Sequence, residues 1–333
     1  MEKIEKISPE GKSRKEQLPE METIFYYSPH WTEEDARLLK KNLEKVDVFC
    51  PEMYGYEAEN VEVINRLAQG DHPLLIKYLS SRADAWTKII CQAVFDSKKI
   101  IWPIDIKKSK LAEDFDATYE MNKTALRQFG MGELEKAMET RRAYIKSQVE
   151  AQKKREEIIL ENFKKLPEEI CAEHSELKRK KKLRVLVTLG AFHTFVYHEA
   201  KKAGYSAEEV LATKPYIFSR AIEALRKERF SGESHFSDEF IAKSFIEDFL
   251  TIYFEKFSLD IAKNDAAARI VASQVDFDLI KKISASMETR PRPDSDKLAY
   301  VADFLRKNSI EVPKNKEEFE KLVEDYQKKK FGK

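Results

Sequence analysis

The sequence predicts an α/β fold: a mostly parallel central sheet with flanking helices, a long helical insertion and a mostly helical C-terminal region. Short apolar runs of strand length alternate with longer segments whose apolar residues recur every three or four positions, as they do in helices. Glycine is scarce, at 9 of 333 residues, and 36% of the residues are charged. This composition favours long solvated helices over a sandwich or barrel, which needs many turns.

The first strand–helix–strand unit follows a polar tail that we expect to be flexible over residues 1–20. The apolar runs TIFYYS (23–28) and VDVFCPEM (46–53) flank a helical segment with Thr32 as N-cap and Asp35 three residues later. This Thr-x-x-Asp pattern is an acidic form of the capping box. The short links between strand, helix and strand predict a parallel βαβ unit.

Two further strands complete a predicted α/β core over residues 21–205. A helical stretch over about 61–97 leads to KKIIWPIDI (98–106), whose nearly continuous apolar run is typical of a strand buried on both faces. The fourth strand is LRVLVTLG (183–190), and the helix after it ends at Gly204.

A helical insertion, about 108–180, separates the third and fourth strands. Gly130 and Gly132 divide it into two helical segments, and Pro167 is expected to close the second. Its apolar residues recur at spacings of three and four, so one face should dock against the rest of the protein. The last region, 206–333, reads as helical almost throughout, without a further clear strand.

The charge balance limits the classes of partner. Lys and Arg total 60 against 59 Asp and Glu, for a net charge of +1, so nucleic-acid binding is not expected. The basic run ELKRKKKLR directly precedes the fourth strand, and a solvated link explains it more simply than a phosphate-binding patch. No segment approaches about 18 uncharged apolar residues, so no membrane span is predicted. We expect a cytoplasmic protein, because there is no signal-peptide pattern and the three cysteines fall in no paired spacing.

Polar side chains stand where each predicted strand gives way to a loop. They are His30, Glu52, Asp105 and His193. Because parallel strands deliver their carboxyl ends to one rim, we expect these side chains to meet in one crevice. His30, Glu52 and His193 suit a divalent metal (Mn, Co or Zn) with open positions for water. The same set also suits a general base with its orienting partners and no metal. Tyr54 and Tyr56 either line a pocket beside Glu52 or pack over the sheet edge.

The order of these motifs resembles that of the TraB/Tiki/erythromycin-esterase (ChaN-like) superfamily, over about residues 21–204. LVTLGAFHTFVYHEAKKAGY resembles its Gly-x-x-His strand-to-helix motif, with His193 as the histidine. IFYYSPHW is similar to its opening strand, turn and histidine, here His30. VDVFCPEM and KKIIWPIDI resemble the next two strands, which end in Glu52 and Asp105.

The resemblance also implies an arginine on a helix. ETRRAYIKS matches best with Arg141, and the neighbouring Arg142 is the alternative. Tiki-like members are metal-dependent proteases and erythromycin-esterase-like members open a lactone, so the resemblance implies a hydrolase acting on a small-molecule ester or a peptide. The arginine would stabilise the oxyanion. The implied catalytic set is His30, Glu52, Arg141 and His193, with Asp105 beside them.

A second hypothesis is a non-enzymatic regulatory or binding protein built on the same fold. Superfamily members usually carry glycine at the place of Tyr27, and its absence removes the close backbone approach that such a turn provides. In this case the charged amphipathic helices of the insertion and the C-terminal region dock a partner or form a homodimer.

Overall fold

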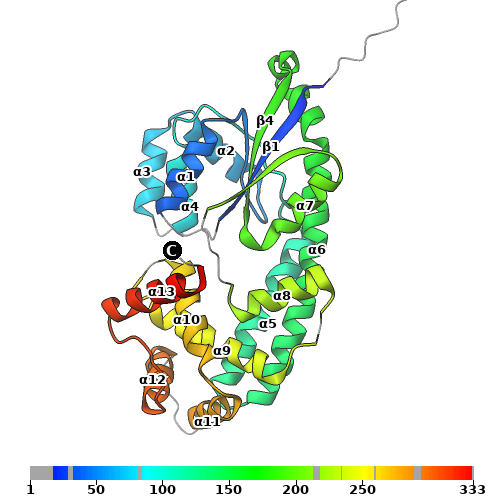
Figure 1. Ribbon diagram of the computed structural model, residues 1–333. Coiled ribbons are helices and arrows are strands. Elements are labelled where there is room, and N and C mark those ends of the chain that lie inside the picture. The colour runs from blue at the N-terminus through cyan, green and yellow to red at the C-terminus, as the bar shows by residue number, and fades with distance from the viewer. Residues whose placement is uncertain are drawn as a thin grey trace, which may run out of the picture.

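In the part of the chain that the structure describes, five strands form an all-parallel sheet in the order β3-β2-β4-β1-β5, which lies at one end of the molecule (Figure 1). The computed structural model describes residues 18–28, 33–81, 85–212, 218–233, 235–258, 260–288 and 294–331. In this described part, 13 α-helices flank the sheet or extend away from it. The predicted α/β fold with helical regions is confirmed.

The two central strands, β1 and β4, end at the same level of the sheet. The strands are β1 (Glu20–Ser28), β2 (Val48–Cys50), β3 (Ile100–Ile101), β4 (Lys182–Gly190) and β5 (Ser206–Leu211). β1 pairs with β4 over its whole length, and Ser28 lies opposite Gly190 at the carboxyl end. Most residues of both strands are buried, because both faces of the parallel sheet are covered.

Two strands differ from the prediction. β5 was missed, and it extends the α/β part past the boundary predicted after residue 205. Its sequence, SAEEVL, contains two glutamates and lies at the sheet edge, paired only with β1, so it lacks the apolar run of a buried strand. The strand predicted over 98–106 shrinks to β3, because Pro103 has no N–H to donate to a ladder. The sheet also begins at Glu20, inside the predicted tail.

Helices cover both faces of the sheet. One group is α1 (Glu33–Leu43), α2 (Ala58–Ala68), α3 (His72–Ser80) and α4 (Ala85–Val94). Successive residues of β1 point to opposite faces: Tyr26 packs in the core that contains Leu39 of α1, whereas Phe25 packs on Phe163 of α6 (Leu134–Glu173). Helix α1, which follows β1, thus packs on one face, while α7 (Thr194–Lys202), which follows β4, packs on the other. Adjacent strands whose connections depart to opposite faces open a crevice at their carboxyl ends.

Helix α6 (Leu134–Glu173) joins the sheet to the helical region, and Figure 1 shows it running beside both. α5 (Lys110–Phe129) packs along it. The first part of α6 belongs to the core of the helical region, and its last part lies on the sheet. The prediction that Pro167 closes this helix was wrong: the helix continues for six residues, because the buried Ile170 and Cys171 still pack on the sheet.

The helical region has its own core, which centres on α9. Its remaining helices are α8 (Arg220–Ser231), α9 (Asp238–Phe254), α10 (Ile261–Ser273), α11 (Phe277–Glu288), α12 (Asp294–Lys307) and α13 (Lys316–Phe331). Phe245, Phe249 and Phe254 of α9 pack with residues of α5, α6 and α13. No helix in the described ranges is long and apolar enough to cross a membrane.

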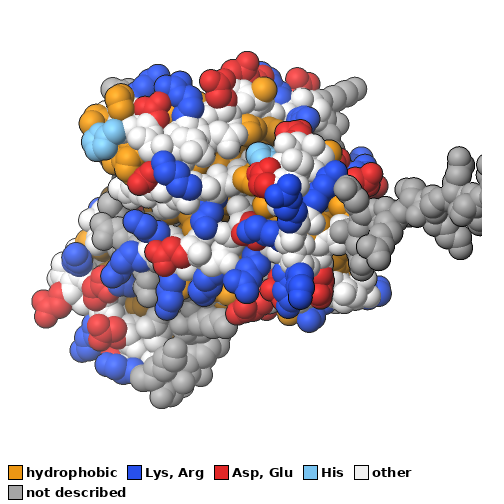
Figure 2. Space-filling view, turned by 90° about the horizontal axis from the view of Figure 1, so that it is seen from above, with side chains coloured by type: hydrophobic (Ala, Val, Ile, Leu, Met, Phe, Trp, Pro, Cys, Tyr) orange, Lys and Arg blue, Asp and Glu red, His pale blue; other side chains and the backbone are white. Residues whose placement is uncertain are grey.

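Charges of both signs are interspersed over the face shown in Figure 2. In the basic run, Lys180 pairs with Asp47, and Lys182, the first residue of β4, pairs with Glu22. These pairs neutralise part of the run.

Candidate active site at the carboxyl rim of the sheet

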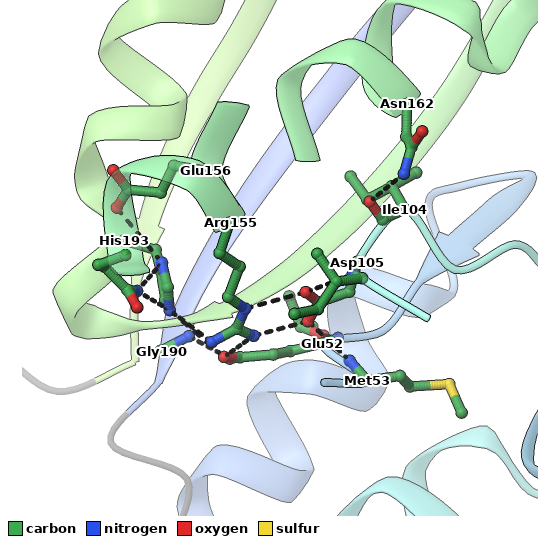
Figure 3. A network of polar contacts seen from close by, with 12 residues as sticks. Glu52, Met53, Ile104, Asp105, Arg155, Glu156, Asn162, Gly190 and His193 are labelled. Carbon is green, nitrogen blue, oxygen red and sulfur yellow. Dashed lines mark hydrogen bonds and ion pairs between the residues drawn. The ribbon is translucent and has the colours of Figure 1, made fainter. Parts of the chain in front are cut away.

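Three of the residues predicted to meet at the strand ends lie around one guanidinium, that of Arg155 (Figure 3). Glu52 follows β2, Asp105 follows β3, and His193 ends the short 3-10 helix η2 (Ala191–His193) after β4. Arg155 lies near the middle of α6. His30 and the expected N-cap Thr32 lie outside the described residues.

Arg155 binds all three partners. Its Nε donates to Asp105 Oδ1 at 2.9 Å, and its Nη2 donates to Asp105 Oδ2 at 2.6 Å and to Glu52 Oε1 at 2.7 Å. Its Nη1 lies 3.2 Å from His193 Nε2. Burial alone would lower the pKa of Arg155, but the charges of Asp105 and Glu52 outweigh it and raise the pKa. The guanidinium therefore stays charged although it is almost fully buried.

Backbone groups of neighbouring strand ends hold the Glu52 carboxylate. Gly190 N–H at the end of β4 donates to Glu52 Oε2, and the Glu52 N–H donates to Thr188 Oγ1 at 3.1 Å. These hydrogen bonds join the loop after β2 to the end of β4.

The Asp105 carboxylate is held in the same way. The N–H of Met53 donates to Asp105 Oδ2 at 3.2 Å, and the N–H of Ile106 donates to Asp105 Oδ1 at 2.8 Å. Both carboxylates are thus oriented before any ligand arrives.

His193 is buried against α6. Gln152 Nε2 lies 2.7 Å from its Nδ1 and 2.8 Å from its Nε2, and Glu156 Oε1 lies 3.4 Å from Nδ1. Tyr27 donates its hydroxyl to the His193 carbonyl at 3.2 Å. Burial and Arg155 lower the pKa of His193, but contacts with Glu156 and Glu52 outweigh them and the pKa is raised.

The polar network continues into the helical region through Glu156. Arg229 of α8 donates from Nε to Glu156 Oε2 at 3.0 Å, and its guanidinium stacks 3.6 Å from the centre of the Phe195 ring. Glu156 is fully buried. The network therefore lies between the core of the sheet and the core of the helical region.

The geometry contradicts the placement of Arg141 in the site. Arg141 lies 14 residues before Arg155, or about 21 Å along the helix at about 1.5 Å per residue. It donates to Asp248 at 2.6 Å, and its guanidinium lies 4.5 Å from the centre of the Phe245 ring. The alternative, Arg142, pairs with Asp238. Arg155, and not Arg141, lies beside Glu52, Asp105 and His193.

A sequence signal for the missed residues exists in α6. The buried polar residues of its middle are Gln148, Gln152, Arg155 and Glu156. Their spacing of four, three and one places them on one side of the helix. The same side is apolar before them, at Tyr144 and Ile145, and after them, at Ile159 and Phe163. A polar interruption of a docking face indicates buried polar partners.

The described donors do not fit a divalent metal. Among the residues that the structure covers, no three His, Cys, Asp or Glu side chains converge as a metal group. Glu52 Oε1 and His193 Nε2 lie 3.5 Å apart, but both contact the Arg155 guanidinium. A cation placed between them would meet this positive charge.

A pocket of about 460 Å³ opens beside Glu52 and is lined by Tyr54 and Tyr56. The Glu52 side chain is 14% exposed, against 5% for Arg155 and His193 and 1% for Asp105. Tyr54 lies over Arg155, with its ring centre 5.3 Å from the guanidinium carbon, and donates to Asp116 at 3.2 Å. Glu52 is thus the network residue that faces the pocket.

The fold and the site define an α/β protein with a buried polar network at the carboxyl rim of a parallel sheet. No protein-family model matches this chain, and neither the search of curated proteins nor that of solved structures finds a match. The resemblance to the TraB/Tiki superfamily stays a prediction from the motifs, and function has to be argued from the site itself.

Proposed function

We propose that the protein is a hydrolase in which Glu52 activates a water molecule that attacks the carbonyl carbon of an ester or a peptide bond. The supporting observation is the position of Glu52, which belongs to the buried network and also lines the pocket. A general base must reach both its water and the substrate, and among the described network residues Glu52 meets this condition.

The reaction follows ordinary acyl transfer to water. The Glu52 carboxylate takes a proton from the water while the water oxygen bonds to the carbonyl carbon. The carbonyl π electrons move onto the carbonyl oxygen. The tetrahedral intermediate then collapses: the carbonyl re-forms and the bond to the leaving oxygen or nitrogen breaks. The leaving atom takes from Glu52 the proton that came from the water. The products are an acid and an alcohol or amine.

Arg155 supplies the positive charge for this reaction. Its guanidinium is fixed beforehand by Asp105 and Glu52, so it needs no reorganisation as negative charge develops on the substrate. Such fixed charge in a largely buried site typically contributes a few kcal/mol to transition-state stabilisation.

His193 and Asp105 are positioning residues in this proposal. Their side chains are 5% and 1% exposed, so contact with the substrate is left to Glu52. Asp105 holds Arg155 in place, and His193 contacts both Arg155 and Glu52.

The test is turnover of 4-nitrophenyl esters and fluorogenic peptides by wild-type protein and by Glu52→Gln. We expect Glu52→Gln to lower kcat by about 10²- to 10⁴-fold, as loss of a general base does. The matched control is Glu62→Gln, which changes an exposed carboxylate on α2 outside this pocket and should leave kcat unchanged. Absence of turnover of every ester and peptide by the wild type would refute the proposal.

The second candidate is a non-enzymatic binding protein, and one observation favours it. Arg155, Asp105 and His193 are buried and bind one another, as in a network that only joins two parts of a fold. In this case Glu52→Gln changes the free energy of unfolding alone, and partner binding maps to substitutions on the outer helices.

A further inference from the structure

The walls of the 460 Å³ pocket come from one loop and three helices. The lining residues after the loop Pro51–Tyr56 are Asn60, Val63, Ile64, Tyr78, Thr87, Ile90 and Cys91. Ile64 and Ile90 belong to the core under α1, whereas Val63 and Cys91 belong to a small separate cluster with Leu67 and Leu74. The pocket therefore opens between two apolar clusters, and its aliphatic and aromatic residues lie beside the polar Asn60 and Thr87.

The charge that the described residues bring to the pocket lining is negative. Glu52 is the charged residue of this lining, and no Lys or Arg of the described chain lines it. Arg155 lies behind Glu52, but Asp105 and Glu52 together bring two negative charges to its single positive charge. A ligand group with a negative charge would be repelled by Glu52 without a cation of the lining to compensate.

The other large hollow near the sheet differs in the charge of its lining. It measures about 1260 Å³, and its lining includes Arg66, Lys98 and Lys99 together with several glutamates. It contains none of Glu52, Asp105, Arg155 and His193. Among the described residues, a lining without Lys or Arg therefore distinguishes the smaller pocket beside Glu52.

We propose that this pocket is the subsite for the acyl group of the substrate, and that it takes an alkyl or aryl acyl group without negative charge. The inference rests on the proposed function. It places the substrate carbonyl at Glu52 and the acyl group between α2 and α4, against Ile64 and Ile90. The volume is in the range of small-molecule pockets, about 300–1,000 Å³. The substrate class is thus esters or amides of uncharged apolar carboxylic acids.

The first experiment measures kcat/KM for 4-nitrophenyl acetate, butyrate, hexanoate and octanoate and for the 4-nitrophenyl hemiester of succinate. Each methylene buried in the pocket should raise kcat/KM about three- to fourfold until the pocket is full. The hemisuccinate should be hydrolysed more slowly than the butyrate of the same chain length. A series that does not rise, or a preference for the hemisuccinate, would overturn the subsite.

Two variants link this series to the pocket. Ile64→Trp and Val63→Phe fill the space between α2 and α4, so each should lower the ratio of octanoate to acetate kcat/KM at least tenfold. The control is Ile76→Trp on α3, whose side chain is exposed and outside the pocket, and which should leave the ratio unchanged. If folded samples of both filling variants keep the wild-type ratio, the proposed location is wrong.

The second experiment separates the subsite from the proposed hydrolysis. Calorimetric titration of the wild type with 4-phenylbutylamine, 4-phenylbutan-1-ol and 4-phenylbutyrate needs no turnover. We expect the amine and the alcohol to bind at least tenfold more tightly than the carboxylate. This order without any esterase activity would support the pocket and refute the hydrolase. Equal or tighter binding of the carboxylate in an active hydrolase would refute the subsite alone.

Discussion

Arg155→Met removes the charge at the centre of the network and keeps an apolar side chain of similar length. Arg155 lies 2.6 Å from Asp105 and 2.7 Å from Glu52, and the side chain of Asp105 is 1% exposed. In the variant these carboxylates face each other without the guanidinium. Loss of one partner from a buried ion pair destabilises by about 3–5 kcal/mol, because the remaining charge stays buried without compensation. We expect a loss of this size in the free energy of unfolding.

A double-mutant cycle separates this effect from lost packing. If Asp105 and Arg155 compensate each other, Asp105→Asn in the Arg155→Met background removes the uncompensated charge. The double variant should then be less destabilised than the sum of the single variants, by about 1–3 kcal/mol. Urea unfolding followed by far-UV circular dichroism gives the three free energies.

The control for the cycle is Arg66→Met. Arg66 pairs with Asp71 at 2.6 Å, the same distance as in the buried pair, but its side chain is 55% exposed. An exposed pair typically contributes about 0–1 kcal/mol. A loss at Arg155 as small as that at Arg66, or strict additivity in the cycle, would contradict the buried network.

Three further predictions concern the rest of the fold. Burial raises the pKa of Asp265 to about 7 from 3.8. Its contribution to the free energy of unfolding is therefore complete below pH 3.8 and is lost as pH rises through 7. In Asp265→Asn, the free energy of unfolding measured in urea at a series of pH values should fall less over this range. Gly132 and Gly204 both have positive φ (85° and 90°), so alanine at either position costs about 1–2 kcal/mol in backbone strain. Gly132→Ala should lower the free energy of unfolding more than Gly204→Ala, because its new Cβ would also lie 2.7 Å from Glu288 Cβ. Pro167→Ala should raise the thermal midpoint and stabilise the fold by about 1–3 kcal/mol, because it restores a hydrogen bond inside α6. Pro73→Ala, in the first turn of α3, should restore no such bond and leave the midpoint unchanged. Equal effects of the two substitutions would refute the role of helix position.

The sequence predicts the central strands well because burial on both faces makes them apolar. β1 and β4 have nearly the predicted bounds, and the polar residues Glu52, Asp105 and His193 after the strands were recognisable against this apolar background. β5 was missed because an edge strand with two glutamates lacks that contrast. The end of α6 was misplaced because packing of its last turns on the sheet outweighs the local effect of Pro167.

The arginine of the site was harder to predict. In a chain with 36% charged residues, helical arginines look alike along the sequence. Arg141 and Arg155 both lie on the buried face of α6, and the tertiary partner decides the role of each: Asp248 of α9 for Arg141, and Asp105 and Glu52 for Arg155. The cluster of Gln152, Arg155 and Glu156 on one docking face distinguishes the second position, and that pattern is visible in the sequence once the face is known.

The most direct test of the proposed site is a crystal structure of the protein with 1,1,1-trifluoro-2-octanone, whose hydrate mimics the tetrahedral intermediate of acyl transfer. We predict one hydrate oxygen within about 3 Å of a Glu52 carboxylate oxygen. The alkyl chain should lie between Ile64 and Ile90, with Arg155 still bound to Asp105. Binding of the ketone elsewhere on the saturated protein, or an Arg155 side chain directed away from Glu52 and Asp105, would contradict the account.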